Sequence, residues 1–190
     1  MVSEKITQSL AGRVAILTLF PLSMQELTHA SLLQDTIDEA IFKGGYPRIY
    51  ADSLSAHKLY TNYVHTYVER DVRQIRNIEN LNIFRKFMRL CAGRVGQLLN
   101  ISSLANDCGI EHKTVKAWLS LLEATYIIFM VHPYYKNLGK RLVKSPKMYF
   151  TDTGVVCSLL RIRSPKEVSD SYLRGNLVEN FIMADLFKQR

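Results

Sequence analysis

The side chains best suited to binding chemistry are gathered in residues 101–120, which read ISSLANDCGIEHKTVKAWLS. His112, Lys113, Thr114 and Lys116 are polar or basic and follow one another closely. Such side chains donate hydrogen bonds to phosphate oxygens and to base edges. The spacing therefore predicts a nucleic-acid contact, provided that a helix turns these residues toward solvent.

The apolar residues of the same stretch predict the helices that would present that polar face. They are Leu104, Ala105, Cys108, Ile110, Val115 and Trp118. Ala105 is small where two helices must cross, and Gly109 is placed for a turn with positive φ. Ser102 or Ser103 is expected to cap the first helix, and Glu111 opens the second with a favourable charge. The pattern is typical of a helix-turn-helix.

Two β-prone runs follow, YIIFMVHPY at 126–134 and KMYFT at 147–151, with a basic connection between them. Helices followed by such a ribbon indicate a winged helix, with Lys140, Arg141 and Lys144 as further phosphate contacts. Two alternatives stay open. The helices could be an ordinary helical hairpin, or the winged helix could join domains or bind proteins without touching DNA.

The charge distribution agrees with a phosphate-binding surface. The chain has a net charge of +8, and residues 61–150 hold 14 basic and 6 acidic side chains. Such a basic segment suits a nucleic-acid backbone, whereas a solvated surface or an acidic partner domain is the alternative. Three cysteines without a CxxC pair predict a reducing compartment. No apolar run is long enough for a membrane helix, and no signal peptide is evident, so a cytoplasmic protein without membrane contact is expected.

The first half of the chain predicts helices around one isolated strand. Residues 14–20, VAILTLF, form an apolar run typical of a strand buried on both faces of a parallel sheet. Ser23 and Glu26 have the capping-box spacing of a helix start. Further helices are predicted over 31–44, 53–78 and 81–99, with GGYPRIY at 44–50 as a tight turn.

The last forty residues predict a strand running into a short helix over 148–160, a weak helix in 164–175, and an amphipathic helix over 175–190. The apolar side of that last helix is expected to comprise Leu177, Phe181, Ile182 and Leu186, with Glu179 beside it. No packing partner for the last helix is evident. The five histidines show no metal-ligand spacing, and His57 and His65 are expected to bond tyrosines.

Several motifs in order resemble one protein family. They are TQSLAGRVAILTLFPLSMQEL, GGYPRIY, TYVERDVRQIRNI, KMYFTDTG and GNLVENFI. Together they resemble prokaryotic AAA-type P-loop ATPases that carry the C-terminal domain of unknown function 4143. This resemblance implies a mainly α fold with small β parts, divided into four segments. They are the end of an α/β ATPase core (1–22), a helical lid (23–80), a winged helix (81–150) and the start of a restriction-endonuclease-like domain (151–190).

The resemblance also implies roles for three residues. Arg13 would be an arginine finger or a structural arginine, and Arg48 would sense nucleotide or stabilise a turn. Glu179 would be the helix acid of a nuclease-like site whose remaining acids lie beyond Arg190. Since the chain has neither P-loop nor Walker B acid, we expect a fragment that does not hydrolyse ATP itself. ATP and Mg²⁺ are expected only for the full-length parent, and no metal for the fragment.

Three functions are compatible with these features. The first is the nucleic-acid-binding part of an ATP-dependent protein, with DNA and neighbouring ATPase subunits as partners. The second is a module that couples to another protein without binding DNA. The third is a stand-alone DNA-binding regulator, which the isolated strand and the incomplete last helix disfavour.

Overall fold

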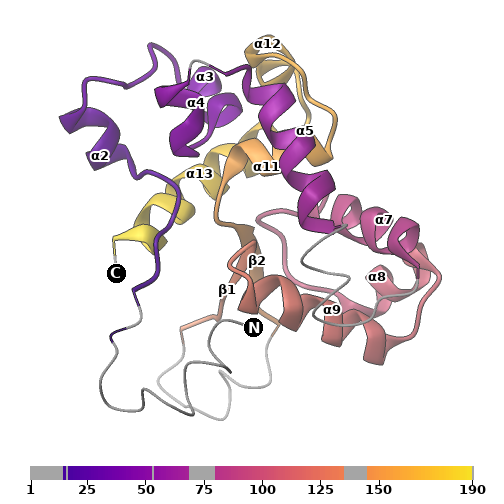
Figure 1. Ribbon diagram of the computed structural model, residues 1–190. Coiled ribbons are helices and arrows are strands. Elements are labelled where there is room, and N and C mark those ends of the chain that lie inside the picture. The colour runs from indigo at the N-terminus through magenta and orange to yellow at the C-terminus, as the bar shows by residue number, and fades with distance from the viewer. Residues whose placement is uncertain (1–14, 16, 53, 69–79, 135–144, 190) are drawn as a thin grey trace.

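The computed structural model describes residues 15, 17–52, 54–68, 80–134 and 145–189 (Figure 1). The described part is mainly helical with a two-stranded sheet, as the sequence predicted. The early helices are α2 (Met24–His29), α3 (Ile37–Lys43), α4 (Pro47–Ala51) and α5 (Ala56–Thr66). Then come α7 (Leu81–Ala92), α8 (Ile101–Cys108), α9 (His112–Ala124), β1 (Ile128–Val131), β2 (Lys147–Phe150), α11 (Thr153–Leu159), α12 (Pro165–Ser169) and α13 (Arg174–Lys188).

Figure 1 shows two groups of helices with the hairpin between them. Helices α7, α8 and α9 lie together at one end, and α2 to α5 lie with α11, α12 and α13 at the other. Helix α11 lies inside the second group, where it contacts α5, α3 and α13 and also reaches α7. Within the described ranges, no helix combines the length and apolar character needed to cross a bilayer.

The starts of α2 and α3 are set by capping boxes. The predicted box at Ser23 and Glu26 is confirmed, and Thr36 and Glu39 form a second one. The expected helix over 31–44 therefore begins six residues late, at Ile37. The reason is local: Ser31 has a φ of 56°, which ends the turn after α2, and Thr36 then caps the new helix.

The predicted turn over 44–50 contains a short helix, because Pro47 at its first position is already in helical φ. Gly44 has a φ of 62°, and a Cβ atom there would lie 2.1 Å from the hydroxyl of Tyr60. Both the positive φ and the close approach of Tyr60 therefore require glycine at position 44. The long helix expected over 53–78 begins at Ala56, and residues 69–79 lie outside the described residues.

The helix expected over 81–99 ends at Ala92, because Gly93 caps it and Gly96 adopts a φ of 72°. The buried strand expected over 14–20 is also wrong for the described residues 15 and 17–20, which form none. Leu17 and Leu19 are 84% and 94% exposed. A parallel strand needs neighbouring strands, and in the described ranges β1 and β2 pair with each other.

The predicted buried face of helix α13 is correct for Leu177 and for Phe181, which packs against the core, but wrong for Ile182 and Leu186, and the helix does have packing partners. Ile182 and Leu186 are 51% and 55% exposed, whereas Leu177, Asn180 and Ala184 are buried against β2, α3 and α11. The Asn180 amide accepts from the Phe150 N–H at 2.7 Å and donates to the Phe150 carbonyl at 3.1 Å. The polar residue thus acts as a strand partner for β2.

Within the group formed by α2 to α5, α11, α12 and α13, the buried carboxylate of Asp152 joins the turn before α4 to the start of α11. It accepts from the Gly45 N–H at 2.7 Å and from the Gly154 N–H at 2.8 Å, which caps α11. Burial raises the pKa of the neighbouring Tyr60 hydroxyl well above its usual value, with the Asp152 charge adding to the effect. The carboxylate therefore holds the glycine turn before α4 against the start of α11.

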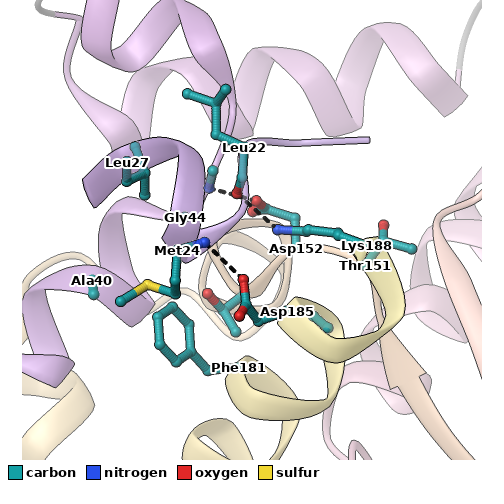
Figure 2. A pocket seen from close by; sticks show the side chains of 13 residues that line it. Leu22, Met24, Leu27, Ala40, Gly44, Thr151, Asp152, Phe181, Asp185 and Lys188 are labelled. Atoms are coloured by element: carbon teal, nitrogen blue, oxygen red, sulfur yellow. Dashed lines mark hydrogen bonds between the residues drawn. The ribbon is translucent and has the colours of Figure 1, made fainter. Parts of the chain in front are cut away.

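Helix α13 completes this joint (Figure 2). Lys188 donates to the Leu22 carbonyl at 3.1 Å, and the Asp185 carboxylate accepts from the Met24 N–H at 2.7 Å. The cavity between them is only about 20 Å³. Because a single water needs about this much space, we interpret the place as a structural joint.

Candidate nucleic-acid interface

Helices α8 and α9 meet at Gly109, whose φ of 76° confirms the predicted turn. Helix α8 is capped by Asn100, whose side-chain amide oxygen Oδ1 accepts from the Ser103 N–H at 2.9 Å. The expectation of Ser102 or Ser103 as the cap is wrong, because the extended residue before the helix is Asn100. Glu111 is the N-cap residue of α9, as its position indicated.

Helix α9 is anchored by its apolar face. Val115 and Leu122 are fully buried, and Trp118 is 8% exposed. The Trp118 ring meets Phe84 and Phe87 of α7 edge-on, with centroids 5.1 and 5.3 Å apart. Such aromatic contacts fix the rotation of the helix, so its opposite face must point to solvent.

That opposite face carries the predicted polar set. His112, Lys113 and Lys116 are exposed, and Thr114 is half-buried. No hydrogen bond or ion pair joins these four side chains to another described residue. The structure thus brings the four residues together on one turn and leaves their donors free for a ligand.

Arg94, which precedes α8 in the sequence, has a charged partner, unlike the lysines of α9. Arg94, in the loop after α7, pairs with Asp107 of α8 and also bonds Ser103 at 3.2 Å. Its charge therefore holds α8 in place, which contrasts with the free lysines of α9.

The hairpin lies beside these helices, with Phe129 opposite Tyr149 and Val131 opposite Lys147. A third segment, which the sequence analysis missed, pairs with the other edge of β2. The Gly96 N–H donates to the Met148 carbonyl at 2.9 Å, and the Leu99 N–H donates to the Pro146 carbonyl at 2.8 Å. Two glycines within the expected helix, at 93 and 96, were the signal for this segment.

Two groups of predicted residues cannot be placed. Lys140, Arg141 and Lys144, between β1 and β2, lie outside the described residues, and so does Arg13. Their roles stay predictions.

Glu179 lies on the side of α13 that faces β2. Its carboxylate accepts from Lys147 Nζ at 2.7 Å and from the Tyr149 hydroxyl. These two bonds lower the pKa of Glu179. In the parts of the chain that the structure describes, no three His, Cys, Asp or Glu side chains cluster as metal ligands. The acid there serves as an ion-pair partner.

Arg48, the predicted nucleotide sensor, lies on the surface of α4. Its side chain is 75% exposed and bonds Asp52 one turn along the helix at 3.1 Å. This geometry matches the alternative of a residue that stabilises its own segment.

Comparisons with known proteins place this arrangement in a family. The domain of unknown function DUF8612 matches residues 34–166, and the chain belongs to that family. An uncharacterised protein of Mycobacterium tuberculosis is 27% identical over 185 residues, which cover 95% of this chain and 40% of the relative. One from Haemophilus influenzae is 25% identical over 202 residues, covering 100% and 49%. The chain thus spans less than half the length of these relatives, and no solved structure matches it.

The family assignment made from the motifs is therefore wrong. The matching family is DUF8612, and neither an AAA-type ATPase nor the domain of unknown function 4143 is found. Short motifs in order were misleading because glycine turns and helix caps recur in unrelated proteins for the same physical reasons. The expectations of ATP, magnesium and ATPase partner subunits rested on that resemblance alone, and nothing else supports them.

Proposed function

We propose that the protein binds nucleic acid, most simply double-stranded DNA, through the exposed start of α9. The observation that carries the proposal is the free polar face of His112, Lys113, Thr114 and Lys116 on a helix whose other face is locked to α7. Lysines on a convex helix suit phosphates along a duplex, and the helix start suits the major groove.

The arrangement around α9 supports a winged helix over residues 81–150. Three helices precede the β1–β2 hairpin, and residues 96–99 add a third strand segment at the edge of β2. In such units the helix corresponding to α9 enters the groove and the hairpin lies over the backbone.

The surface of α8 and α9 favours nucleic acid over a protein partner. No large apolar side chain of 101–124 is among the strongly exposed ones, which a protein interface would need at its centre. The acidic groups on this surface are Asp107, Glu111 and Glu123, and the first of them is paired with Arg94.

The test measures binding of a fluorescently labelled duplex over a range of salt concentrations. The variant K113Q/K116Q removes both free lysines, and K58Q/K166Q removes two exposed lysines from α5 and α12 as the matched control. We expect K113Q/K116Q to lose about tenfold in affinity and to flatten the log–log salt slope by about 2, since each phosphate contact contributes about 0.9.

The control should stay within about twofold of the unaltered chain. If K113Q/K116Q and K58Q/K166Q behave alike, α9 is not the contact and the proposal fails. No duplex binding at low salt would favour the protein-coupling alternative.

A further inference from the structure

Glu111 is a free acid at the start of the basic face of α9. It is the N-cap residue of this helix, and it is exposed. Its carboxylate caps no backbone N–H of α9, and it bonds no other side chain in the part of the chain that the structure describes. Asn100 and Asp152, in contrast, cap α8 and α11 through their side-chain oxygens. The Glu111 carboxylate is therefore available to a ligand.

The other acids of this surface are placed differently. Asp107 pairs with Arg94 and accepts from the Ser103 hydroxyl at 3.2 Å. Glu123 lies near the other end of α9, about 18 Å away at a rise of about 1.5 Å per residue. Among the described residues of α8 and α9, Glu111 is thus the free acid beside the lysines of the first turns.

A carboxylate at this place opposes binding to a phosphate backbone. Phosphate oxygens and carboxylate oxygens are both negative and both accept hydrogen bonds, so they repel each other. Lys113 and Lys116 on the same helix attract the backbone. A surface that bound phosphates alone would therefore bind more tightly without Glu111. The acid is favourable only where the ligand presents a hydrogen-bond donor to it.

The major groove presents such donors at the edges of the bases. The N4 amino group of cytosine is a donor, and glutamate is the side chain that accepts from it. Adenine also has an amino group, but an N7 acceptor lies beside it, and a carboxylate has no donor to offer that nitrogen. Cytosine therefore matches an acceptor-only side chain better than adenine does. The major groove is also where the start of α9 lies in the proposed duplex contact.

From these observations we propose that Glu111 is a specificity-determining residue. It accepts a hydrogen bond from the N4 amino group of a cytosine, while Lys113 and Lys116 bind phosphates. This role rests on the proposed duplex contact, and it defines the substrate class as duplex DNA with a G·C pair at the start of α9. Other duplexes meet the repulsion between the carboxylate and the phosphates without the compensating bond, so the acid lowers general affinity and raises selectivity.

The experiment compares two G·C duplexes that differ only at the cytosine amino groups. One carries cytosine and the other N4-methylcytosine, in which a methyl group replaces the amino hydrogen that faces the major groove. Each duplex is titrated with the full chain at fixed salt, together with an A·T duplex of the same length. The variant E111A removes the acid, and E123A, which removes an exposed acid from the other end of α9, is the matched control. Fluorescence of Trp118, the only tryptophan, checks that each variant is folded.

We expect the unaltered chain and E123A to bind the cytosine duplex about fivefold more tightly than the N4-methylcytosine duplex, since the loss of one base contact has about this effect. E111A should bind the two duplexes alike. It should also bind the A·T duplex more tightly than the unaltered chain does, because the repulsion of the phosphates is gone. Equal discrimination by E111A and the unaltered chain overturns the proposal. A lower Tm of E111A with that result would assign Glu111 to the stability of the helix start alone.

Failure of this role can be told apart from failure of the proposed function. If K113Q/K116Q weakens duplex binding as expected while E111A discriminates like the unaltered chain, only the role of Glu111 is wrong. If the unaltered chain binds none of the duplexes at low salt, the duplex contact and the role of Glu111 are both wrong.

Discussion

The two basic regions differ in shape and in the residue that provides the charge. On α9 the cations are the lysines 113 and 116 on a convex, solvent-exposed turn. The second region is a cavity of about 240 Å³ between α5, α7 and the loop after α11, where the cations are arginines that converge from α7 and from that loop. Lysine is a mobile, hydrated point charge, whereas arginine has a rigid planar fork. The two regions therefore differ in how freely their cationic groups can move and in how many directions they surround a space.

Helix α7 connects the two regions. Phe84 and Phe87 on its inner face hold Trp118 of α9, and Arg85 and Arg89 on another face line the cavity. Helix α7 thus provides both the aromatic contact that holds α9 and part of the cavity wall. The aromatic contact with Trp118 holds α9 against α7.

The largest effect is expected for Trp118→Ala. Removing a large buried aromatic ring should lower the free energy of unfolding by about 3–5 kcal/mol, because the cavity left behind cannot close fully. Urea unfolding followed by circular dichroism measures the change. Leu98→Ala is the control, because Leu98 is 66% exposed, and such substitutions usually change stability by less than about 0.5 kcal/mol.

If Trp118→Ala lowers the free energy of unfolding as little as Leu98→Ala does, the Trp118 ring does not fix α9 on α7. The orientation of the polar face of α9 would then have to depend on other contacts.

The parts of the fold that the sequence predicted well are those with local causes. Gly109 predicted the turn between α8 and α9, and the spacing of Ser23 and Glu26 predicted the start of α2, because each signal acts within one helical turn. The hairpin followed in the same way from its β-branched and aromatic runs, and α11 from the strand-to-helix pattern over 148–160.

The parts that were missed depend on contacts distant in sequence. Asn180 breaks the apolar stripe of α13, and only the pairing of its amide with Phe150 explains its burial. Residues 96–99 look helical until β2 provides an edge. The cavity arginines come from segments about 70 residues apart, so no local pattern joins them.

A smaller effect is expected at Lys147, a cation of the hairpin that differs from both regions because Glu179 partners it. The bonds to Lys147 and Tyr149 lower the folded-state pKa of Glu179 below its ordinary value of 4.5. The pair therefore stabilises the fold above about pH 4.5, and this contribution is lost as the pH falls through the lowered pKa. Because the pair is partly exposed, its contribution is expected to be at most about 1 kcal/mol.

Glu179→Gln should accordingly lower stability at pH 7, and the gap to the unaltered chain should close as the pH falls below 4.5. Urea midpoints across pH 3–7 measure the gap. Glu123→Gln, which removes an exposed acid from α9, is the control for the loss of one carboxylate. A constant gap for Glu179→Gln would mean that Lys147 is as free as the lysines of α9.

The smallest effect on stability is expected from relieving the backbone strain at Arg161, and Ser31, which has a similar φ, serves as the comparison. Ser31 has a φ of 56° at the end of α2, where the Leu32 N–H closes the same motif on the Leu27 carbonyl at 2.9 Å. Glycine relieves such a conformation, so Ser31→Gly and Arg161→Gly should each raise the free energy of unfolding by up to about 1 kcal/mol. Thermal unfolding measures both changes. If Arg161→Gly destabilises the chain while Ser31→Gly does not, the Arg161 side chain stabilises the fold through its own contacts, and these outweigh the backbone strain at this position.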